Sequence, residues 1–263
     1  MTASAVLVLR LAGPLQSWGR PSRYNQRETH HQPTKSGVLG LLAAAQGRPR
    51  ETPITDLLGL RLGVRTDQPG SLLRDYHTVS DHRGLPMPSS QVNAKGIQKK
   101  TSPAKYTGVT KRYYLQDAVF IAALRGPEPL LEALEHALHR PVFPLSLGRR
   151  SCPPTGPVSL GLHPGTALAD ALRTVPWQAS DHHRQRTQGT HVTLAATVED
   201  PNGEHRVADT PDTYDLRTGT LYSNRTVSHT SITIPTGHTP PEAHPLPDTD
   251  PASGHDPFAL LGW

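Results

Sequence analysis

The chain has 263 residues, of which 35% are hydrophobic and 19% charged, and its 22 glycines and 27 prolines make it rich in loops. This balance excludes a long helical bundle, and no apolar run approaches the ~20 residues that a membrane-spanning helix needs, so no membrane partner is expected. The single cysteine, Cys152, excludes an internal disulfide framework and a cysteine-based zinc cluster. These features are typical of a cytoplasmic protein.

The net charge of +5 conceals an uneven distribution of charge along the chain. Residues 1–113 hold 17 Lys and Arg against 6 Asp and Glu, whereas residues 114–263 hold 10 against 16. An excess of positive charge in one half of a chain indicates a polyanionic partner, such as a nucleic acid.

The first third of the chain indicates strands around one helix. The apolar run 6–11 ends at Gly-Pro and predicts a strand rather than a signal peptide, and the polar segment 16–33 predicts a surface loop. Thr34 or Ser36 can cap a helix with apolar residues spaced at 38, 41, 42 and 45, which ends at Gly47. Strands near 60–65 and 72–78 follow, separated by an Asp-Gln-Pro-Gly turn.

An extended basic arm is expected in the middle of the chain. Between positions 82 and 116 the sequence has seven basic residues and no acidic one, interspersed with Gly, Pro and Ser. Strands over 112–115 and 118–124 and a helix over 128–138 come next. The order β-α-β-β-(arm)-β-α predicts an α+β fold with a ferredoxin-like (RRM-like) domain, in which two helices cover one sheet face and the other face is free for a ligand.

We therefore expect three parts. Residues 1–145 form the ferredoxin-like domain with the arm inserted at about 79–111, and residues 146–235 form a smaller β-rich domain with a short helix over 167–174 and strands over 191–198 and 228–234. Residues 236–263 form a Pro-rich acidic tail, because residues 235–257 contain seven prolines, four acidic residues and no Lys or Arg. The tail ends in the apolar segment 258–263, for which docking on a partner and folding back both stay open.

Three basic segments are candidate sites for phosphate groups. The arm combines cations with tyrosines that can stack on unpaired bases. The Gly-rich turn at Arg149, Arg150 and Ser151 can cradle a phosphate between backbone N–H groups and guanidinium groups, and the helix start at Lys35 and Ser36 favours an anion. An ordinary solvated loop is the alternative for the arm, and a plain turn for the Gly-rich segment.

Catalytic chemistry has weaker support. The sequence lacks a His-Glu-x-x-His or clustered Cys/His pattern, so neither a metal nor a cofactor is predicted. Cys152 is expected to be a small buried or loop residue rather than a nucleophile. A metal-independent ribonuclease stays open as an alternative, because Tyr24, His77 and His82 could supply acid–base chemistry.

Five segments in order along the chain resemble the CasD family of subunits in type I-E CRISPR Cascade complexes. They are 8–19 (VLRLAGPLQSWG), 33–42 (PTKSGVLGLL), 74–78 (RDYHT), 112–120 (RYYLQDAVF) and 144–153 (PLSLGRRSCP). The resemblance spans about residues 5–235 and leaves out the tail. Ordered co-occurrence of several motifs is far more specific than any one of them.

The resemblance implies a fold of the repeat-associated (RAMP) superfamily and a non-catalytic role in antiviral defence. Members of the family hold the 5′ handle of the CRISPR RNA, cap the backbone filament of CasC subunits and contact the large subunit CasA, so target DNA is an indirect partner. Their thumb, inserted in the first domain, corresponds in place to the predicted arm. A related subtype I-C protein cuts repeat RNA, which keeps a metal-independent endoribonuclease as the alternative.

The resemblance also implies a set of RNA-binding residues. They follow the first strand, start the first helix, lie in the arm or belong to the Gly-rich turn. The residues are Gln16, Ser17, Trp18, Lys35, Ser36, Lys99, Lys100, Lys105, Arg112, Arg149, Arg150 and Ser151.

Overall fold

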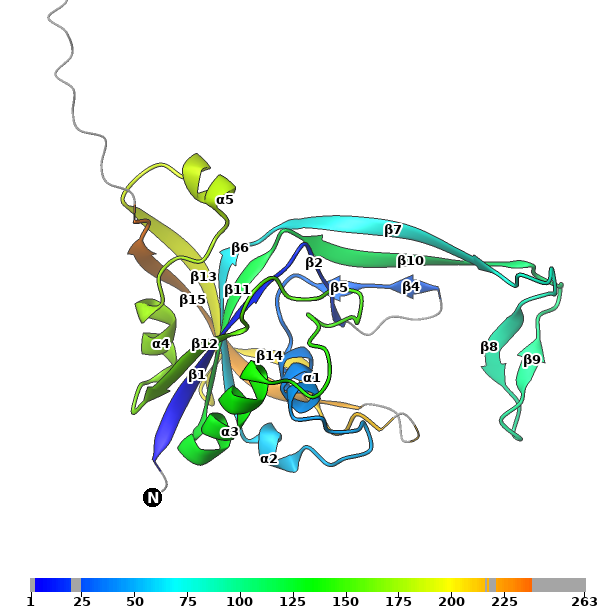
Figure 1. Ribbon diagram of the computed structural model, residues 1–263, viewed down its shortest axis with the longest axis horizontal. Helices are drawn as coiled ribbons and strands as arrows, with labels where there is room; N and C mark the ends of the chain where they lie inside the picture. Colours follow the sequence, from blue (N-terminus) through cyan, green and yellow to red (C-terminus); the bar gives the residue numbers. More distant parts are fainter. Residues whose placement is uncertain (1–2, 20–24, 216, 218–220, 238–263) are drawn as a thin grey trace, which may run out of the picture.

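The computed structural model describes residues 3–19, 25–215, 217 and 221–237 (Figure 1). Most of the predicted tail, including its apolar end over 258–263, lies outside the described residues. The helices are α1 (Lys35–Ala45), α2 (Thr55–Leu58), α3 (Glu128–His139), α4 (Leu168–Thr174) and α5 (Asp181–Arg186). No helix in this described part of the chain combines the length and apolar character of a membrane span.

A seven-stranded sheet forms the centre of the molecule, with the strand order β12-β1-β11-β6-β13-β15-β14 and antiparallel neighbours throughout. Its strands are β1 (Ser4–Ala12), β6 (Arg61–Gln68), β11 (Val119–Pro127), β12 (Ser159–Pro164), β13 (His191–Glu199), β14 (His205–Pro211) and β15 (Tyr222–Pro235). Because β6 is hydrogen-bonded to β13, the N-terminal and C-terminal halves of the chain share one sheet.

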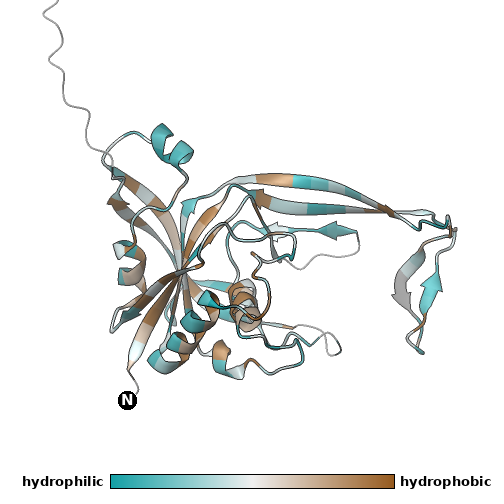
Figure 2. Cartoon of the chain, in the orientation of Figure 1, coloured by the Kyte–Doolittle hydropathy of each residue, from teal (hydrophilic) through white to brown (hydrophobic). Residues whose placement is uncertain are grey.

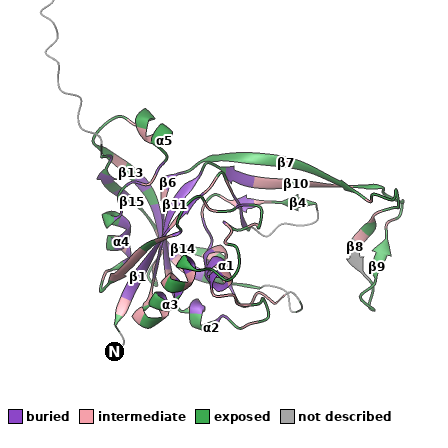
Figure 3. Cartoon of the chain, in the orientation of Figure 1, coloured by how far each residue is buried: buried purple, intermediate pink, exposed green. Residues whose placement is uncertain are grey.

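Alternation of side chains along β1 shows how both faces of this sheet are covered. Leu7 and Leu9 pack in one apolar cluster with α1 and α3, whereas Val6 and Val8 pack in a second cluster with Leu168 of α4. Figure 3 shows buried residues along the central strands, and Figure 2 shows their apolar character. The expectation of a free sheet face for a ligand is therefore wrong, because α4 and the segment that follows it, with Val175 and Trp177, cover that face.

A long arm projects from this body (Figure 1). The projecting arm (residues 71–116) consists of β7 (Ser71–Ser80) paired along its length with β10 (Thr107–Gln116), and a hairpin of β8 (Pro88–Val92) and β9 (Gln98–Lys100) at its far end. The strand predicted over 72–78 exists but lies in the arm, not in the core sheet, and Leu72 and Tyr76 are 54% and 61% exposed. The arm therefore begins earlier and ends later than the predicted range 79–111.

Four short strands lie within or next to the loop predicted over 16–33. They are β2 (Leu15–Gln16), β3 (Trp18–Gly19), β4 (Gln26–Arg27) and β5 (Thr29–His30). β2 pairs antiparallel and β4 pairs parallel with β10, and they thereby anchor the base of the arm.

The predicted α+β class is confirmed, and several predicted elements are present. α1 begins after Thr34, whose Oγ1 accepts a hydrogen bond from Gly37 N, and α3 and α4 match the predicted helices within one residue. β12, β14 and the hairpin of β8 and β9 were not predicted.

Candidate nucleic-acid interface

A groove of about 970 Å³ lies between α1, the segment that follows it and the loop over 143–150. Among the described residues, four arginines from two distant parts of the chain line it, and Glu51 is the one acidic lining residue. Small polar residues and two tyrosines complete the walls. The polar and aromatic lining residues are Ser17, Thr34, Ser36, Arg48, Arg50, Glu51, Phe143, Ser146, Arg149, Arg150, Tyr214 and Tyr222.

The Gly-rich loop packs directly against the segment that follows β1. Gly148 has φ +86°, and a Cβ at this position would lie 1.8 Å from the carbonyl oxygen of Ser17. Ser17 N donates to Leu147 O over 3.0 Å, and Leu147 N donates to Cys152 O over 2.7 Å. Only glycine therefore fits position 148, because it combines a left-handed conformation with this close approach.

Arg149 is held at the base of the arm, whereas Arg150 is exposed. The two terminal amino groups of Arg149 donate to the carbonyl oxygens of Tyr113 and Arg27, over 3.2 and 2.8 Å. Its Cζ also lies 4.8 Å from the ring centroid of Tyr114. Arg149 thus joins the loop to the arm while it contributes positive charge to the groove, and Arg150 has its guanidinium available to a ligand.

Ser151 is exposed, and the neighbouring Cys152 is buried. Burial raises the pKa of the Cys152 thiol, and this effect is larger than the opposing effects of Ser151 and Arg149. The thiol therefore stays protonated near neutral pH, which agrees with the prediction that Cys152 is a buried residue rather than a nucleophile.

Gln16 and Trp18 lie in the core instead of on an RNA-binding surface. Both are 0% exposed. Gln16 Nε2 donates to the carbonyl oxygens of Leu11 and Ala118, and its Oε1 accepts from Trp18 Nε1 over 3.1 Å. These two side chains have their polar groups satisfied within the protein, so they stabilise the segment that carries Ser17, which lines the groove.

Lys35 is also turned away from the groove. Its side chain is 3% exposed, and Nζ donates to both carboxylate oxygens of Glu199 over 3.0 and 3.1 Å. Its backbone N–H donates to Asp209, whose carboxylate is paired with Arg225. The helix start therefore holds protein carboxylates, and Lys35 Nζ is paired within the protein instead of lining the groove.

Ser36, the next residue, lines the groove. Its carbonyl oxygen accepts a hydrogen bond from the hydroxyl group of Tyr214. Burial raises the pKa of Tyr214, so this hydroxyl stays protonated and keeps donating. Tyr214 thereby fixes one wall of the groove.

The predicted cations of the arm do not reach the groove. Lys99 and Lys100 lie in β9, at the far end of the arm (Figure 1), and Lys105 is exposed in the segment between β9 and β10. Arg112 lies nearer the base, where it is the cross-strand partner of Asp75. The structure thus separates the predicted residues into a groove and a distant basic arm end.

Two arginines and two tyrosines are among the groove residues that were not predicted from the sequence. Arg48 and Arg50 follow the glycine that ends α1, and this short basic cluster is a signal that could have been used. Arg48 forms a two-bond ion pair with Asp56, over 2.7 and 2.6 Å, which lowers the pKa of that carboxyl group. Tyr214 and Tyr222 come from a remote part of the chain, and nothing local in the sequence marks them as neighbours of α1.

The two described candidates for acid–base chemistry, His77 and His82, belong to the arm and do not line the groove. Tyr24 lies outside the described residues. His77 Nδ1 lies 3.5 Å from Thr110 Oγ1 on the arm, and His82 is exposed in the turn after β7. Within the described ranges, no three His, Cys, Asp or Glu side chains are grouped as they are in a metal site.

The profile of a family described as CRISPR-associated protein (Cas_Cas5) matches residues 6–231, a range that includes the arm and both walls of the groove. The chain belongs to the Cas5 family. The resemblance to CRISPR proteins predicted from the sequence is thereby confirmed. The match extends from β1 into β15, so the family features cover nearly the whole seven-stranded sheet.

Two kinds of relatives support the Cas5 assignment. The chain is 38% identical over 212 residues to the CRISPR system Cascade subunit CasD of Escherichia coli (strain K12), which covers 73% of this chain and 87% of that protein. A chain of a solved CRISPR RNA-guided surveillance complex superposes with a TM-score of 0.71 at 32% identity, covering 90% of this chain and 95% of its own. A crystal structure of a Cas protein gives a TM-score of 0.60 at 34% identity, with coverages of 89% and 97%.

Proposed function

We propose that this Cas5-family protein is a non-catalytic subunit of a cytoplasmic Cascade surveillance complex and that it binds the 5′ handle of the CRISPR RNA. The observation that carries the proposal is the groove, which is lined by the exposed Arg50 and Arg150 together with Tyr214 and Tyr222. Guanidinium groups neutralise phosphates, and aromatic rings stack on unpaired bases, so the groove fits a short single strand of RNA.

The strand order supports a ferredoxin-like unit of the RAMP type. In this interpretation the unit consists of β1, α1, β6, β11, α3 and β12, whose strands are ordered β12-β1-β11-β6 with both helices on one face. β12, and not the strand at 72–78, supplies the fourth strand. The C-terminal strands extend the same sheet, and the groove forms where this unit meets Tyr214 and Tyr222.

The projecting arm is proposed to be the thumb of the subunit. It extends away from the groove and has exposed lysines at its far end, including Lys99, Lys100 and Lys105 (Figure 1). An extended basic hairpin can follow an RNA backbone toward the next subunit of a filament. We expect contacts with a CasC backbone subunit along the arm and with the large subunit CasA elsewhere, and target DNA as an indirect partner.

The proposal is tested with purified protein, labelled CRISPR repeat RNA and a scrambled RNA of equal length, without divalent metal. We expect retention of the intact handle sequence and weaker binding of the scrambled RNA. The double variant Arg50→Ala with Arg150→Ala removes two exposed groove cations and should lower the salt slope of binding by about 1.4, since each phosphate contact on a single strand contributes about 0.7. The matched control, Arg173→Ala with Arg186→Ala, removes equal charge from α4 and α5.

Three outcomes would contradict the proposal. Equal binding of both RNAs would indicate a general single-strand binder. An unchanged salt slope in the groove variant would show that the groove is not part of the RNA interface. Cleavage within the repeat that is lost on His77→Ala would instead support the metal-independent endoribonuclease.

A further inference from the structure

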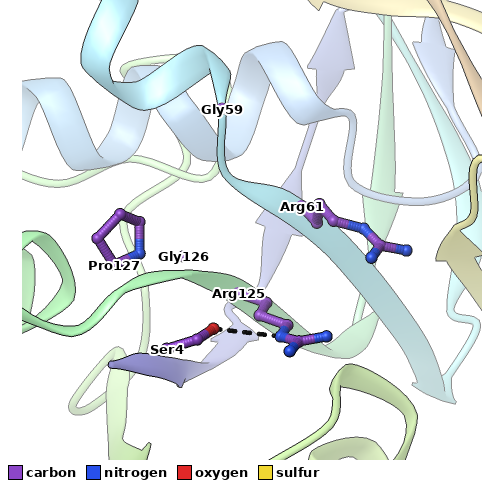
Figure 4. Close-up of a pocket in the computed structure, with 6 residues that line it drawn as sticks. All are labelled: Ser4, Gly59, Arg61, Arg125, Gly126 and Pro127. Carbon is purple, nitrogen blue, oxygen red and sulfur yellow. Dashed lines mark hydrogen bonds between the residues drawn. The ribbon is translucent and has the colours of Figure 1, made fainter. Parts of the chain in front are cut away.

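A second basic site lies at the end of the sheet where β1 begins. A cavity of about 280 Å³ is lined by Ser4, Gly59, Arg61, Arg125, Gly126 and Pro127 (Figure 4). None of these lining residues is acidic. This site is separated from the groove by the length of β1, because Ser4 starts that strand and Ser17 follows its end.

The two arginines are direct neighbours across the sheet. Arg125 of β11 and Arg61 of β6 are cross-strand partners, and Val6 of β1 is the partner of Arg125 on the other side. All three residues lie on the face of the sheet that α4 covers further along, as Val6 and Ile121 show by packing with Leu168. Like charges placed directly opposite each other destabilise a sheet, so this pair favours an anion between or beside them.

The hydrogen bonds of the pair leave donors unused. Arg125 Nε donates to Ser4 Oγ over 3.2 Å, as Figure 4 shows, and within the described residues its two terminal amino groups make no hydrogen bond. Arg61 donates through one terminal amino group to Glu199 O over 2.8 Å, while its Nε is buried without a hydrogen-bond partner in the described part of the chain. A buried donor of this kind costs free energy unless a ligand satisfies it.

The acidic residues around the cavity favour a single carboxylate over an RNA strand as its ligand. Two acidic residues lie close to the cavity. Glu128 directly follows Pro127. The pKa of Asp200 is lowered, mainly by hydrogen bonds from Asn202 N and Ser228 and to a smaller extent by the positive charge of Arg61. An RNA strand that continued past the cavity would be repelled by these carboxylates. One isolated anionic side chain would not extend to them, and the cavity of about 280 Å³ is at the lower end of the range of about 300–1,000 Å³ that small-molecule sites occupy.

We infer that the Arg61–Arg125 cavity receives an Asp or Glu side chain of another protein subunit of the complex. Arg125 offers its planar pair of amino groups to the carboxylate, and the positive charge of Arg61 on the neighbouring strand adds to the attraction. No atom lies within 4 Å of a Cβ added at Gly59, so this glycine leaves room for the approaching chain. The inference depends on membership of a multisubunit complex, as proposed above, but not on handle binding.

The test uses the full chain added to the other subunits of its own complex, preassembled on CRISPR RNA. Arg125→Glu should raise the dissociation constant of the chain from this assembly by about 30-fold or more, as expected when a buried ion pair is broken, and Arg125→Gln should raise it by about tenfold. The control Arg186→Glu makes the same charge change on α5 and should leave the constant within about twofold. Thermal unfolding of the isolated Arg125→Gln variant should match that of the wild-type chain, which shows that it folds.

A photo-crosslinking amino acid at position 125 identifies the occupant. A crosslink to a subunit peptide that contains Asp or Glu supports the inference. A crosslink to RNA, or unchanged dissociation constants for both Arg125 variants, would overturn it. Handle binding by the isolated wild-type chain is measured separately, so failure of the proposed RNA-binding function is distinguishable from failure of this site.

Discussion

The guanidinium group of Arg149 lies over the ring of Tyr114, with Cζ 4.8 Å from the ring centroid. Tyr114 is buried in β10 at the base of the projecting arm, and the same guanidinium donates to the carbonyl oxygens of Tyr113 and Arg27. These contacts join the Gly-rich loop, the arm and β4. Arg149 therefore sets the direction of the arm relative to the groove, in addition to its charge.

Arg149→Ala and Arg150→Ala are predicted to differ in stability. Loss of two hydrogen bonds and of the contact with Tyr114 should lower the free energy of unfolding by about 1–2 kcal/mol in Arg149→Ala. Arg150→Ala should change it by less than about 0.5 kcal/mol, because Arg150 is exposed. Urea unfolding measures both values, and equal stabilities would contradict the structural role of Arg149.

Gly148→Ala is predicted to disrupt the Gly-rich loop. A methyl group here would meet Ser17 O at 1.8 Å in a left-handed conformation, so we expect a loss of about 3 kcal/mol or more and weaker RNA binding. Gly156→Ala is the matched control, since its φ of +77° is similar but no atom lies within 4 Å of the added Cβ. The control should cost only about 1–2 kcal/mol. Similar losses in the two variants would show that the close approach to Ser17 is unimportant.

Lys35→Ala is predicted to act on stability rather than on RNA affinity. Glu199 would lose its closest cation, and breaking such a buried pair costs about 3–5 kcal/mol. Lys95→Ala removes an exposed lysine of the arm end and should leave stability unchanged. Chemical denaturation gives the stability, and titration with handle RNA gives the affinity of the folded protein. A stable Lys35→Ala variant that no longer binds RNA would show that Lys35 belongs to the RNA-binding site.

Replacing Lys99, Lys100 and Lys105 together with alanine is predicted to act on RNA affinity alone. All three are exposed, so the melting temperature should not change. If each neutralises one phosphate, the salt slope for binding a full-length CRISPR RNA should fall by about 2. Binding of a short RNA with only the handle should be unaffected, because these lysines are remote from the groove. An equal loss of affinity for both RNAs would show that the handle binds to the arm instead of the groove.

Local patterns predicted α1, α3 and α4 because the signals of these helices are local, whereas the short helices α2 and α5 were not predicted. Thr34 caps α1 by accepting a hydrogen bond from the N–H of Gly37, three residues later. In α3, the buried leucines 131, 134 and 138 have the three- and four-residue spacing of an amphipathic helix. The strand at 72–78 was placed in the core because an arm strand and a core strand share the same residue preferences. Only its pairing with β10, away from the main sheet, distinguishes them.

The errors at the candidate site come from partners that are distant in sequence. Lys35 can bind an anion, as predicted from the sequence, but the anion that it binds is Glu199, which is 164 residues away in the chain. Gln16 is polar and was predicted to be accessible, yet its amide group satisfies two buried carbonyl groups of the core. Arg149 and Arg150 were predicted correctly as a cationic turn, but their separate surroundings follow only from the fold.

The pairing of β6 with β13 has a consequence for how the chain folds. Three residue pairs, from Gly63–Val198 to Arg65–Ala196, connect strands that are more than 130 residues apart, and Lys35 completes its ion pair with Glu199 in the same region. Until β13 has been synthesised, the nascent chain exposes an unpaired strand edge and a lysine without its carboxylate. The subunit is therefore expected to acquire its native structure late in translation and to unfold in one cooperative transition.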